Sequence, residues 1–471
     1  EIFAGDTVLK LPDGEVSGRI IQIGGEKYYR IEHYDRIAPF LMSVVSRADH
    51  WMFISSSGGL TCGRKNPNQA LFPYDTDDKI HDSAAHTGPR SSFLVEKAGR
   101  THLWEPFRTD LALYTTQRNL YKNLVGNRLI FEEINDSLGL AYSCSWSVSP
   151  RFGFVKTSTM RNIGGDEVSV EALDGIRNLL PPGVTRAMQS GRSTLVDAYK
   201  QAAVDPLTGV GIYSLSSIPS DRAEPSEALQ ATVAWCLGLE DPVVLLSGRQ
   251  SSAFCAGLPV EPEPTLNGQR CAYFVKTGFT LPPKEEKSWR LIADIGLGPS
   301  ELPALLECIS GGIDAEDVEA DIDSGTQHLV QLAGRADGCQ LTDDELAAAR
   351  HFTNTMFNIM RGGVFADEYR IRHDDFLAFV ARWNKPLCER FGGLLEKQPD
   401  PLSRDALFSI VDATGDAHLI RLALEYLPLT FSRRHGDPSR PWNDFNIDTQ
   451  GSQGRDRLHY QGNWRDIFQN W

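Results

Sequence analysis

The last twelve residues of the sequence combine side chain types that bind sugars. Residues 460–471 have the sequence YQGNWRDIFQNW, in which Arg465 and Asp466 stand among aromatic and amide side chains that include Gln469 and Asn470. Aromatic rings pack against the C–H faces of a sugar, while guanidinium, carboxylate and amide groups bind its hydroxyls with fixed geometry. We therefore predict that Arg465, Asp466, Gln469 and Asn470 bind substrate in a saccharide pocket.

A second segment of the same character lies just upstream. Trp442 and Asn443 occur within residues 438–446, PSRPWNDFN, where the prolines indicate an irregular loop. We predict that both residues bind the same substrate. Two structural alternatives stay open: Arg465 and Asp466 form an ion pair that fixes a loop, and Trp442 anchors its own loop on the helical core.

Other polar clusters have simpler interpretations. Arg64, Lys65 and Asp78 lie in polar segments that we interpret as a solvated rim, with a contribution to the pocket as the alternative. The acidic residues near Asp78 lack the glycine and the closing glutamate of a helix–loop–helix calcium site. Residues 369–375, YRIRHDD, are interpreted as a solvated helix start. The sequence contains neither a GxSxG nucleophile elbow nor a phosphate-binding loop.

The composition is that of a globular protein with more than one domain. Its 471 residues are 41% hydrophobic and 23% charged. No apolar run approaches the roughly 20 residues of a membrane helix, so we expect a soluble protein. The net charge of −15 disfavours nucleic acid as a partner. Eight cysteines without metal-type spacing, and no secretory segment before Glu1, predict a reduced, cytoplasmic setting.

Apolar residues alternate with a period of two through residues 1–296. Residues 18–25, GRIIQIGG, and 128–134, RLIFEEI, are examples bounded by turn residues. Many such runs in succession predict a large antiparallel β-sandwich. The other predicted strands are 140–147, 152–158, 231–239, 243–246, 271–280 and 289–295.

The pattern changes to helical spacing at residue 297. Residues 297–340 are predicted to be a helical linker, with helices that begin near Pro299 and Asp314. Residues 341–345 supply an N-cap and an acidic first turn for a helix that ends at Gly362 and Gly363. We assign residues 341–471 to an all-helical domain. Its further helical segments are 376–383, 387–395, 403–411 and 417–427.

This order of segments and the two polar motifs resemble the cellobiose-phosphorylase family. The family includes chitobiose phosphorylases, 1,2-β-oligoglucan phosphorylases and the C-terminal region of cyclic β-1,2-glucan synthases. The similar motifs are Trp442-Asn443 and residues 463–466, NWRD, with Gln469. Residues 119–122, NLYK, and 152–158, FGFVKTS, are similar to strands of that family's N-terminal sandwich.

The resemblance implies a β super-sandwich, a helical linker and an (α/α)6 barrel. It also implies inverting phosphorolysis of β-linked gluco-oligosaccharides, with inorganic phosphate as co-substrate and no cofactor or metal. Arg465 and Asp466 would bind hydroxyls of the sugar on the non-reducing side of the cleaved bond, with Gln469 in support. Asn470 departs from the family, which usually has a carboxylate there, so the hydroxyl pattern differs or the site has diverged.

The length of the helical part sets a further expectation. Twelve barrel helices with their loops need about 250 residues or more, whereas about 130 follow Leu341. We therefore expect residues 341–471 to be the N-terminal part of the barrel, and this chain alone to be inactive. The family's general acid lies in a later barrel loop, which we expect after Trp471, so no catalytic residue is assigned.

Two other functions stay open at this point. A glycoside hydrolase or transglycosylase on the same scaffold would transfer the sugar to water or to another acceptor. A non-catalytic carbohydrate-binding protein would have lost the reaction, and Asn470 is the residue that favours this alternative. An oligosaccharide is the expected partner in each case, and the formation of a homodimer is left open.

Overall fold

The computed structural model describes most of the chain, in two compact units. The described residues are 2–10, 14–109, 112–219, 228–432, 436–440, 442, 444–449, 456–458 and 463–469. The first unit, here called the sandwich unit, comprises residues 1–329 and 436–445. The second, the helical unit, comprises residues 330–435 and 446–471. Each unit is described by itself.

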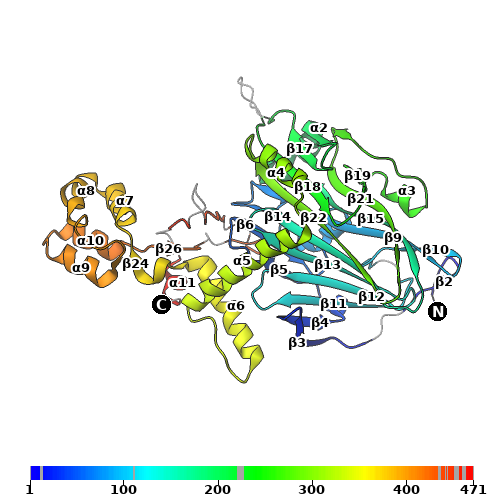
Figure 1. Ribbon diagram of the computed structural model, residues 1–471, viewed down its shortest axis with the longest axis horizontal. Helices are drawn as coiled ribbons and strands as arrows, with labels where there is room; N and C mark the ends of the chain where they lie inside the picture. Colours follow the sequence, from blue (N-terminus) through cyan, green and yellow to red (C-terminus); the bar gives the residue numbers. More distant parts are fainter. Residues whose placement is uncertain are drawn as a thin grey trace. The chain divides into compact units, whose positions relative to one another are not determined.

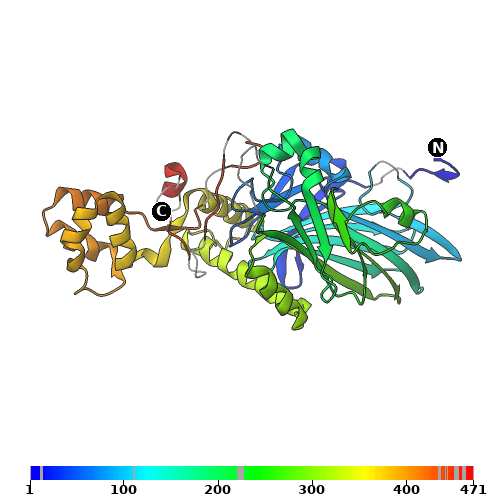
Figure 2. The ribbon, with the colours of Figure 1, turned by 90° about the horizontal axis from the view of Figure 1, so that it is seen from above.

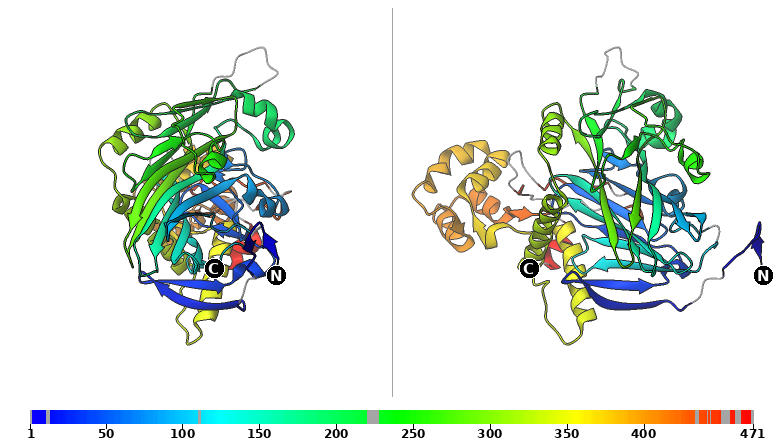
Figure 3. Two further views of the ribbon diagram at one scale, coloured as in Figure 1. Left: turned by 90° about the vertical axis from the view of Figure 1, so that its right-hand side faces the viewer. Right: turned by 45° about the vertical axis from the view of Figure 1, so that its right-hand side comes forward.

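The largest sheet of the sandwich unit has eleven antiparallel strands within the described residues. The sequence predicts this because period-two alternation places every second side chain on the same face, as in Leu129–Asn135, where buried and half-buried residues alternate. The hairpin of β3 and β4 forms one edge of the sheet (dark blue in Figure 3). In spatial order, the strands are β20 (Thr265–Asn267), β16 (Lys200–Val204), β17 (Gly211–Leu215), β18 (Ala231–Leu237), β22 (Glu286–Leu297), β14 (Gly153–Asn162), β13 (Leu140–Ser149), β12 (Leu129–Asn135), β11 (Thr116–Asn123), β4 (Glu26–Glu32) and β3 (Ser17–Ile23).

A second sheet, of five strands among the described residues, packs face to face with the large sheet. Its strands, in spatial order, are β10 (Arg100–Trp104), β9 (Gly88–Lys97), β15 (Val168–Leu179), β21 (Cys271–Leu281) and β19 (Val243–Leu245). The main hydrophobic core lies between the sheets, where Phe93 of β9 contacts Tyr142 of β13 with ring centroids 5.0 Å apart. The predicted antiparallel sandwich is therefore present.

Shorter elements complete the sandwich unit. The strands β5 (Leu41–Val44), β6 (His50–Ser55), β7 (Leu60–Arg64) and β8 (Ala70–Phe72) form a separate sheet in that order. The strands β1 (Phe3–Ala4) and β2 (Thr7–Val8) pair near the N-terminus. The helical elements between strands are η1 (Tyr34–Arg36), α1 (Asp77–Asp82), η2 (Ser83–Ala85), α2 (Arg186–Tyr199) and α3 (Ser251–Cys255).

Two helices cover the outer face of the large sheet. α4 (Glu301–Ser310) and α5 (Ala315–Arg335) follow the last strand, as the helical spacing after residue 297 predicts. Val318 and Ile322 of α5 pack against apolar side chains of the sheet such as Trp235 and Ile292. Figures 1 and 2 show these yellow-green helices on the side of the large sheet that faces away from the small sheet. The burial of this stripe removes apolar surface from water and fixes the start of α5 on the sheet.

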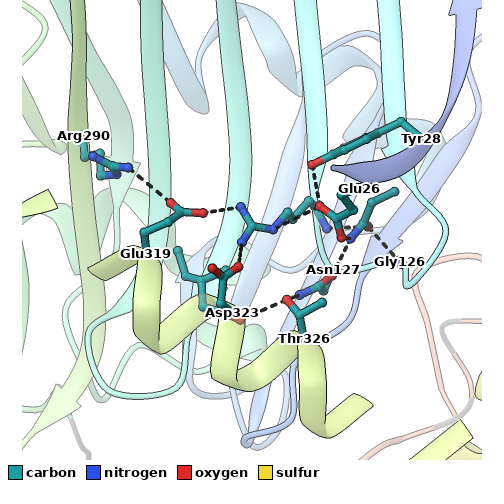
Figure 4. A network of polar contacts seen from close by, with 11 residues as sticks. Glu26, Tyr28, Gly126, Asn127, Arg290, Glu319, Asp323 and Thr326 are labelled. Atoms are coloured by element: carbon teal, nitrogen blue, oxygen red, sulfur yellow. Dashed lines mark hydrogen bonds and ion pairs between the residues drawn. The ribbon is translucent and has the colours of Figure 1, made fainter. Parts of the chain in front are cut away.

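A network of charges adds to this contact. Arg128, next to β12, forms ion pairs with Glu319 and Asp323 of α5, the second at 2.5 Å, and its Nε lies 3.6 Å from Glu26. Arg290 of β22 reaches the other oxygen of Glu319 at 3.2 Å. Figure 4 shows Glu26, Arg290, Glu319 and Asp323 where the helix faces the strands, together with Asn127 and Thr326. The acidic side of α5 is therefore matched by arginines of the sheet.

The segment 436–445 belongs to the sandwich unit although it follows the helices in sequence. Phe445 is buried against an aromatic cluster of this unit, with its ring centroid 5.5 Å from Trp51, 6.3 Å from Phe53 and 5.8 Å from Tyr74. Edge-to-face ring contacts of this kind stabilise a segment that has no regular structure of its own. Aromatic packing is thus the anchor of the segment that contains Trp442.

The helical unit begins with the end of α5 and with α6 (Glu345–Gly362), whose N-cap is the Asp344 carboxylate. A two-stranded ribbon follows, in which β23 (Val364–Phe365) pairs with β26 (Leu429–Thr430). The chain between these two strands therefore begins and ends at this ribbon. The elements between them are η3 (Ala366–Tyr369), β24 (Arg370–Ile371), α7 (His373–Trp383), α8 (Lys385–Phe391), η4 (Gly392–Leu394), β25 (Leu402–Ser403), α9 (Arg404–Asp412) and α10 (Ala417–Glu425). The last described helix is α11 (Trp464–Gln469).

The helices α7 to α10 form a module with a core of its own. Their buried residues, from Ile371 to Tyr426, contact one another in a single cluster. The side chains of Asn384, Ser403 and Asp416 cap the N-termini of α8, α9 and α10, which explains why the sequence predicts these helices. The prediction of sheets followed by helices is confirmed. The (α/α)6 barrel stays a prediction, because these four helices form a separate module.

Candidate functional site

A cavity of about 430 Å³ lies in the helical unit, between the end of α5 and the segment formed by β23 and η3. It is lined from α5, from β23 and from η3 by polar, charged and aromatic residues together. These residues are Gln331, Gly334, Arg335, Val364, Phe365, Glu368 and Tyr369. A cavity of this size, with a few polar groups set among apolar ones, is typical of a small-molecule site.

The backbone of η3 holds an unusual conformation at the wall of this cavity. Asp367, Glu368 and Tyr369 have φ angles of 47°, 53° and 68°. Non-glycine residues in this left-handed region are destabilised by roughly 1–2 kcal/mol each, because Cβ approaches the following carbonyl oxygen. Consecutive residues of this kind occur mainly where a function requires a fixed geometry. The turn directs Glu368 and Tyr369 to the cavity.

Two aromatic rings form the apolar part of the cavity. Tyr369 stacks on Phe365 with ring centroids 4.6 Å apart and an angle of 27° between the rings. Phe365 is buried, whereas Tyr369 keeps 46% of its surface exposed. An exposed ring with a fixed orientation can pack against a sugar face, and Gln331, Arg335 and Glu368 can bind hydroxyls beside it. The cavity therefore has the chemistry of a saccharide site.

The C-terminal helix α11 packs next to this cavity. Ile467 is buried in one cluster with Phe365, Leu427 and Leu429, which join β23 to β26. Asp466 is also buried, with 1% of its side chain exposed, and its Oδ2 lies 3.1 Å from Nε of Arg361 in the last turn of α6. The helix that contains the predicted motif is thus fixed by one ion pair and one apolar contact.

Close backbone contact explains a glycine at the end of α6. A Cβ atom added at Gly362 would lie 2.5 Å from the backbone nitrogen of Ile467 and 2.6 Å from the carbonyl carbon of Asp466. No side chain fits this space. Gly362 therefore allows α11 to approach α6 closely enough for the pair between Arg361 and Asp466 to form.

The structure gives the two predicted motif residues different environments. Arg465 keeps 64% of its side chain exposed and can reach a ligand, while its Nε lies 3.2 Å from Oδ1 of Asp466. Asp466 accepts a hydrogen bond from Arg465 and forms an ion pair with Arg361. The ion-pair alternative raised from the sequence describes Asp466 well, and binding of sugar hydroxyls by either residue stays a prediction.

The structure says less about the other predicted site residues, Trp442, Asn443, Gln469 and Asn470. Trp442 is 75% exposed and belongs to the sandwich unit through the anchored segment 436–445. In this segment Phe445, and not the exposed Trp442, packs against the aromatic cluster of the sandwich unit. Gln469 is the last residue of α11. Asn443 and Asn470 lie outside the described residues.

The polar residues of the sandwich unit form local contacts. Arg64 donates to both oxygens of Asp294, at 2.8 and 2.6 Å, and forms an ion pair with Asp49 at 2.9 Å. Asp78 lies in the first turn of α1, where the hydroxyl of Thr76 lowers the pKa of its carboxyl. Lys65 has a φ of 56° in the turn after β7. These contacts explain Arg64 and Asp78 as structural residues.

Sequence reasoning missed Arg361, Phe365 and Tyr369 as parts of the site. We interpreted Tyr369 as part of a solvated helix start, and α7 does begin at His373 with two acidic residues in its first turn. The run of acidic and aromatic residues from Asp367 to Tyr369 was the available indication. Nothing local shows that Arg361 meets Asp466, more than a hundred residues away.

Among the described residues, no cluster of His, Cys, Asp and Glu has the arrangement needed to hold a metal ion. None of the described helices combines the length and the apolar character required to cross a bilayer.

Residues 365–428 match the family model named glycoside hydrolase family 149 insertion domain 1. The match begins at Phe365 in β23 and ends just before β26, so it coincides with the module that the ribbon encloses. No curated protein matches the chain. The sequence match is therefore to an inserted module.

The solved structures to which the chain is similar have low sequence identity. A bacterial glucoamylase in complex with acarbose is 9% identical, with a TM-score of 0.34 over 87% of this chain and 53% of its own. A protein assigned as a kojibiose phosphorylase from the human microbiome is 9% identical, with a TM-score of 0.30 over 71% of this chain and 38% of its own. A galactose mutarotase-like protein from Clostridium acetobutylicum is 9% identical, with a TM-score of 0.30 over 59% of this chain and 98% of its own. At these scores the likenesses support no inference about function.

Proposed function

We propose that the protein containing this chain is a carbohydrate-active enzyme that cleaves β-linked gluco-oligosaccharides with inorganic phosphate. The observation that supports this most directly is the coincidence of the family 149 insertion model with the module between β23 and β26. Family 149 consists of β-glucan phosphorylases. The matched segment, residues 365–428, also contributes Phe365, Glu368 and Tyr369 to the cavity.

The chemistry proposed is an inverting displacement at the anomeric carbon. A carboxylic acid donates a proton to the glycosidic oxygen while phosphate attacks from the opposite face, so a β-linked glucosyl unit leaves as α-glucose 1-phosphate. We assign no residue of this chain to the proton donor. The proposal gives this chain the task of binding and orienting the saccharide.

We propose a role in this binding for individual residues. Tyr369 packs against a sugar face, and Arg335 and Glu368 bind hydroxyls around it. Arg465, held by Asp466, contributes a further guanidinium near the cluster of Phe365 and Ile467. Gln469, Asn470, Trp442 and Asn443 remain proposed substrate contacts on the basis of their motifs alone.

The test incubates the natural full-length protein with β-1,2-, β-1,3- and β-1,4-linked gluco-oligosaccharides, with phosphate in one series and sulfate in the other. Proton and phosphorus NMR follow the anomeric products. α-Glucose 1-phosphate that forms only with phosphate supports the proposal.

Three other outcomes contradict it. Release of free glucose at equal rates in both series shows a hydrolase. Longer oligosaccharides in both series show a transglycosylase. Saturable binding without turnover shows a carbohydrate-binding protein that lacks the reaction.

A further inference from the structure

The sandwich unit contains a second, larger cavity that the proposed reaction does not use. Its volume is about 770 Å³, and residues of β9, α1, η2, β15 and α3 contribute to its lining. We call it the arginine cavity because Arg90, Arg108 and Arg177 all line it. Every residue that lines it belongs to the sandwich unit.

Positive charge exceeds negative charge in the arginine cavity. Glu105 is the partner of two arginines: one oxygen pairs with Arg90 and the other accepts from Arg108 at 2.8 Å. Arg177 instead donates to the carbonyl oxygens of Ala85 and Ala84, at 2.8 and 2.7 Å. Among the described residues, Arg177 has no ion pair. Among the described residues that line the cavity, Glu105 is the enclosed carboxylate, since Asp82 at the cavity wall is exposed to solvent.

The arginines retain capacity to bind a ligand. The Nε–H groups of Arg90 and Arg177 are buried and have no hydrogen-bond partner within the described part of the chain. The Arg90 side chain is nevertheless 37% exposed, so its guanidinium remains open to the cavity. Burial, and then the neighbouring Arg90, lower the pKa of Arg177 to about 10. An anion that binds between these two guanidinium groups would offset the repulsion between them.

The backbone around the cavity has an irregular conformation at two points. The pairing of β15 with β21 shifts between Arg177 and Leu179, and the extra residue, Asn178, has a φ of 62°. Such a bulge changes the direction of the adjacent side chain, here Arg177. On the other wall, Phe107 has a φ of 64° and donates its N–H to Glu133 at 2.7 Å. Irregularities of this kind are found next to ligand sites.

The other residues that line the cavity indicate which chemical groups the ligand carries besides the anion. Ser57, Ser252 and His81 provide hydroxyl and imidazole groups, and Phe107 provides an apolar surface. The volume is far more than one inorganic phosphate needs and lies in the range of sites for small organic ligands. Hydroxyls of a sugar would match the serines and Glu105, as carboxylates accept them strongly.

From this geometry we infer that the arginine cavity is a binding site for a phosphorylated monosaccharide. The phosphate lies between Arg90 and Arg177, and the sugar hydroxyls contact Glu105 and the serines. This binding requires no turnover, so it holds or fails independently of the proposed phosphorolysis.

Isothermal titration calorimetry of the chain of residues 1–471 tests the inference. The probes are glucose 6-phosphate, glucose 1-phosphate, glucuronate, glucose and inorganic phosphate. We expect one of the two sugar phosphates to bind at least about tenfold more tightly than the other probes. Equal binding of glucose overturns the role of the anion, and equal binding of inorganic phosphate overturns the role of the sugar. Tighter binding of glucuronate overturns the assignment of phosphate, and no saturable binding overturns the site.

Substitutions of the arginines test whether the sugar phosphate binds in the arginine cavity. Arg90→Met and Arg177→Met should each weaken it about 10- to 100-fold, as expected when a hydrogen bond to a charged group is lost. Arg90→Lys should retain part of the affinity. Arg19→Met is the matched control, because Arg19 is exposed on β3 and lies outside the cavity lining. Unchanged affinity in the two methionine variants overturns the inference.

A footprint on the unmodified chain covers the case in which these variants fold poorly. Cys255 lines the arginine cavity, and Cys339 is exposed in the helical unit. Saturating ligand should slow alkylation of Cys255 by iodoacetamide at least fivefold while leaving Cys339 unchanged. Equal slowing of both thiols, or no slowing of Cys255, contradicts binding in this cavity.

Discussion

Nζ of Lys156 on β14 lies 2.6 Å from Oδ1 of Asp174 on β15, and both side chains are completely enclosed between the two sheets. Ser91, Ser158 and the indole of Trp289 donate further hydrogen bonds to Asp174. Burial opposes the charged ammonium, but the Asp174 carboxylate outweighs this and raises the pKa of Lys156 above its usual range. The pair joins the sheets at the centre of the core.

Removal of one partner should therefore be costly. Lys156→Met leaves an uncompensated buried carboxylate, and we expect it to lower the free energy of unfolding by about 3–5 kcal/mol. The double variant Lys156→Met with Asp174→Leu should recover most of this loss. Lys79→Met, at an exposed pair on α1, is the control and should change stability by less than about 0.5 kcal/mol. Urea unfolding followed by tryptophan fluorescence measures all three, and equal losses in Lys156→Met and Lys79→Met would refute the prediction.

The contact between α5 and the large sheet should depend on pH. Burial opposes the charge of Glu319, but Arg128 and Arg290 outweigh it and lower its pKa below the ordinary 4.5. A lowered folded-state pKa adds stability above pH 4.5 that is lost as the pH falls through the folded-state value. The hydrogen-exchange protection factors of residues 315–329, corrected for the intrinsic exchange rate at each pH, should fall below pH 4.5.

Arg128→Met tests the origin of that dependence. We expect a loss of about 1–2 kcal/mol in the protection of α5 at pH 7, a modest value because the pair is partly open to solvent. In the same variant, the protection of α5 should depend less on pH below 4.5 than it does in the unmodified chain. An unchanged acid dependence would assign the effect to another group.

Gly362 offers a test of the contact between α6 and α11. In an exposed helix, Gly→Ala stabilises by roughly 0.5–1 kcal/mol. At Gly362 the added methyl would overlap the backbone of Asp466 and Ile467, so we expect Gly362→Ala to destabilise and to expose α11 to proteolysis. Gly325→Ala on α5 is the control, since its added methyl meets only Pro150 at ordinary contact distance, 3.5 Å. Stabilisation by both substitutions would show that α11 does not pack as described.

Tyr369 tests the cavity in the helical unit. Tyr369→Ala removes the exposed ring of the stack with Phe365, and we expect oligosaccharide affinity to fall about 5- to 10-fold, consistent with a loss of roughly 1 kcal/mol. Tyr369→Phe should keep most of the affinity. Trp383→Ala, at an exposed ring on α7 outside the cavity lining, is the matched control. Titration calorimetry of the full-length protein measures the change, and equal effects of Tyr369→Ala and Trp383→Ala would contradict a specific site.

Local patterns predicted much of the fold. The strand Leu129–Asn135 alternates because one of its faces is buried, and helices with caps such as Asp344 begin within a few residues of their predicted starts. α2 escaped prediction because its sequence is polar. Only Val196 is buried along its length, so no apolar stripe marks it, although Thr185 caps it.

The candidate site depended on contacts that no local pattern contains. The motif at Arg465 and Asp466 was visible as a composition, but its partner Arg361 lies on another helix. Trp442 stood out as an aromatic residue, yet Phe445 in the same loop makes the packing contacts. The left-handed turn at Glu368 and Tyr369 follows from tertiary constraints, because neither residue favours that conformation by itself.

The ribbon between β23 and β26 has a consequence for how such chains diverge. Val364 faces Thr430 and Phe365 faces Leu429, so the start and the end of some sixty intervening residues are neighbours. Lineages can therefore enlarge, exchange or delete the intervening cassette in one genetic event while the flanking helices keep their course. Because Phe365 and Tyr369 lie at this junction, each such exchange would also remodel the wall of the adjoining cavity.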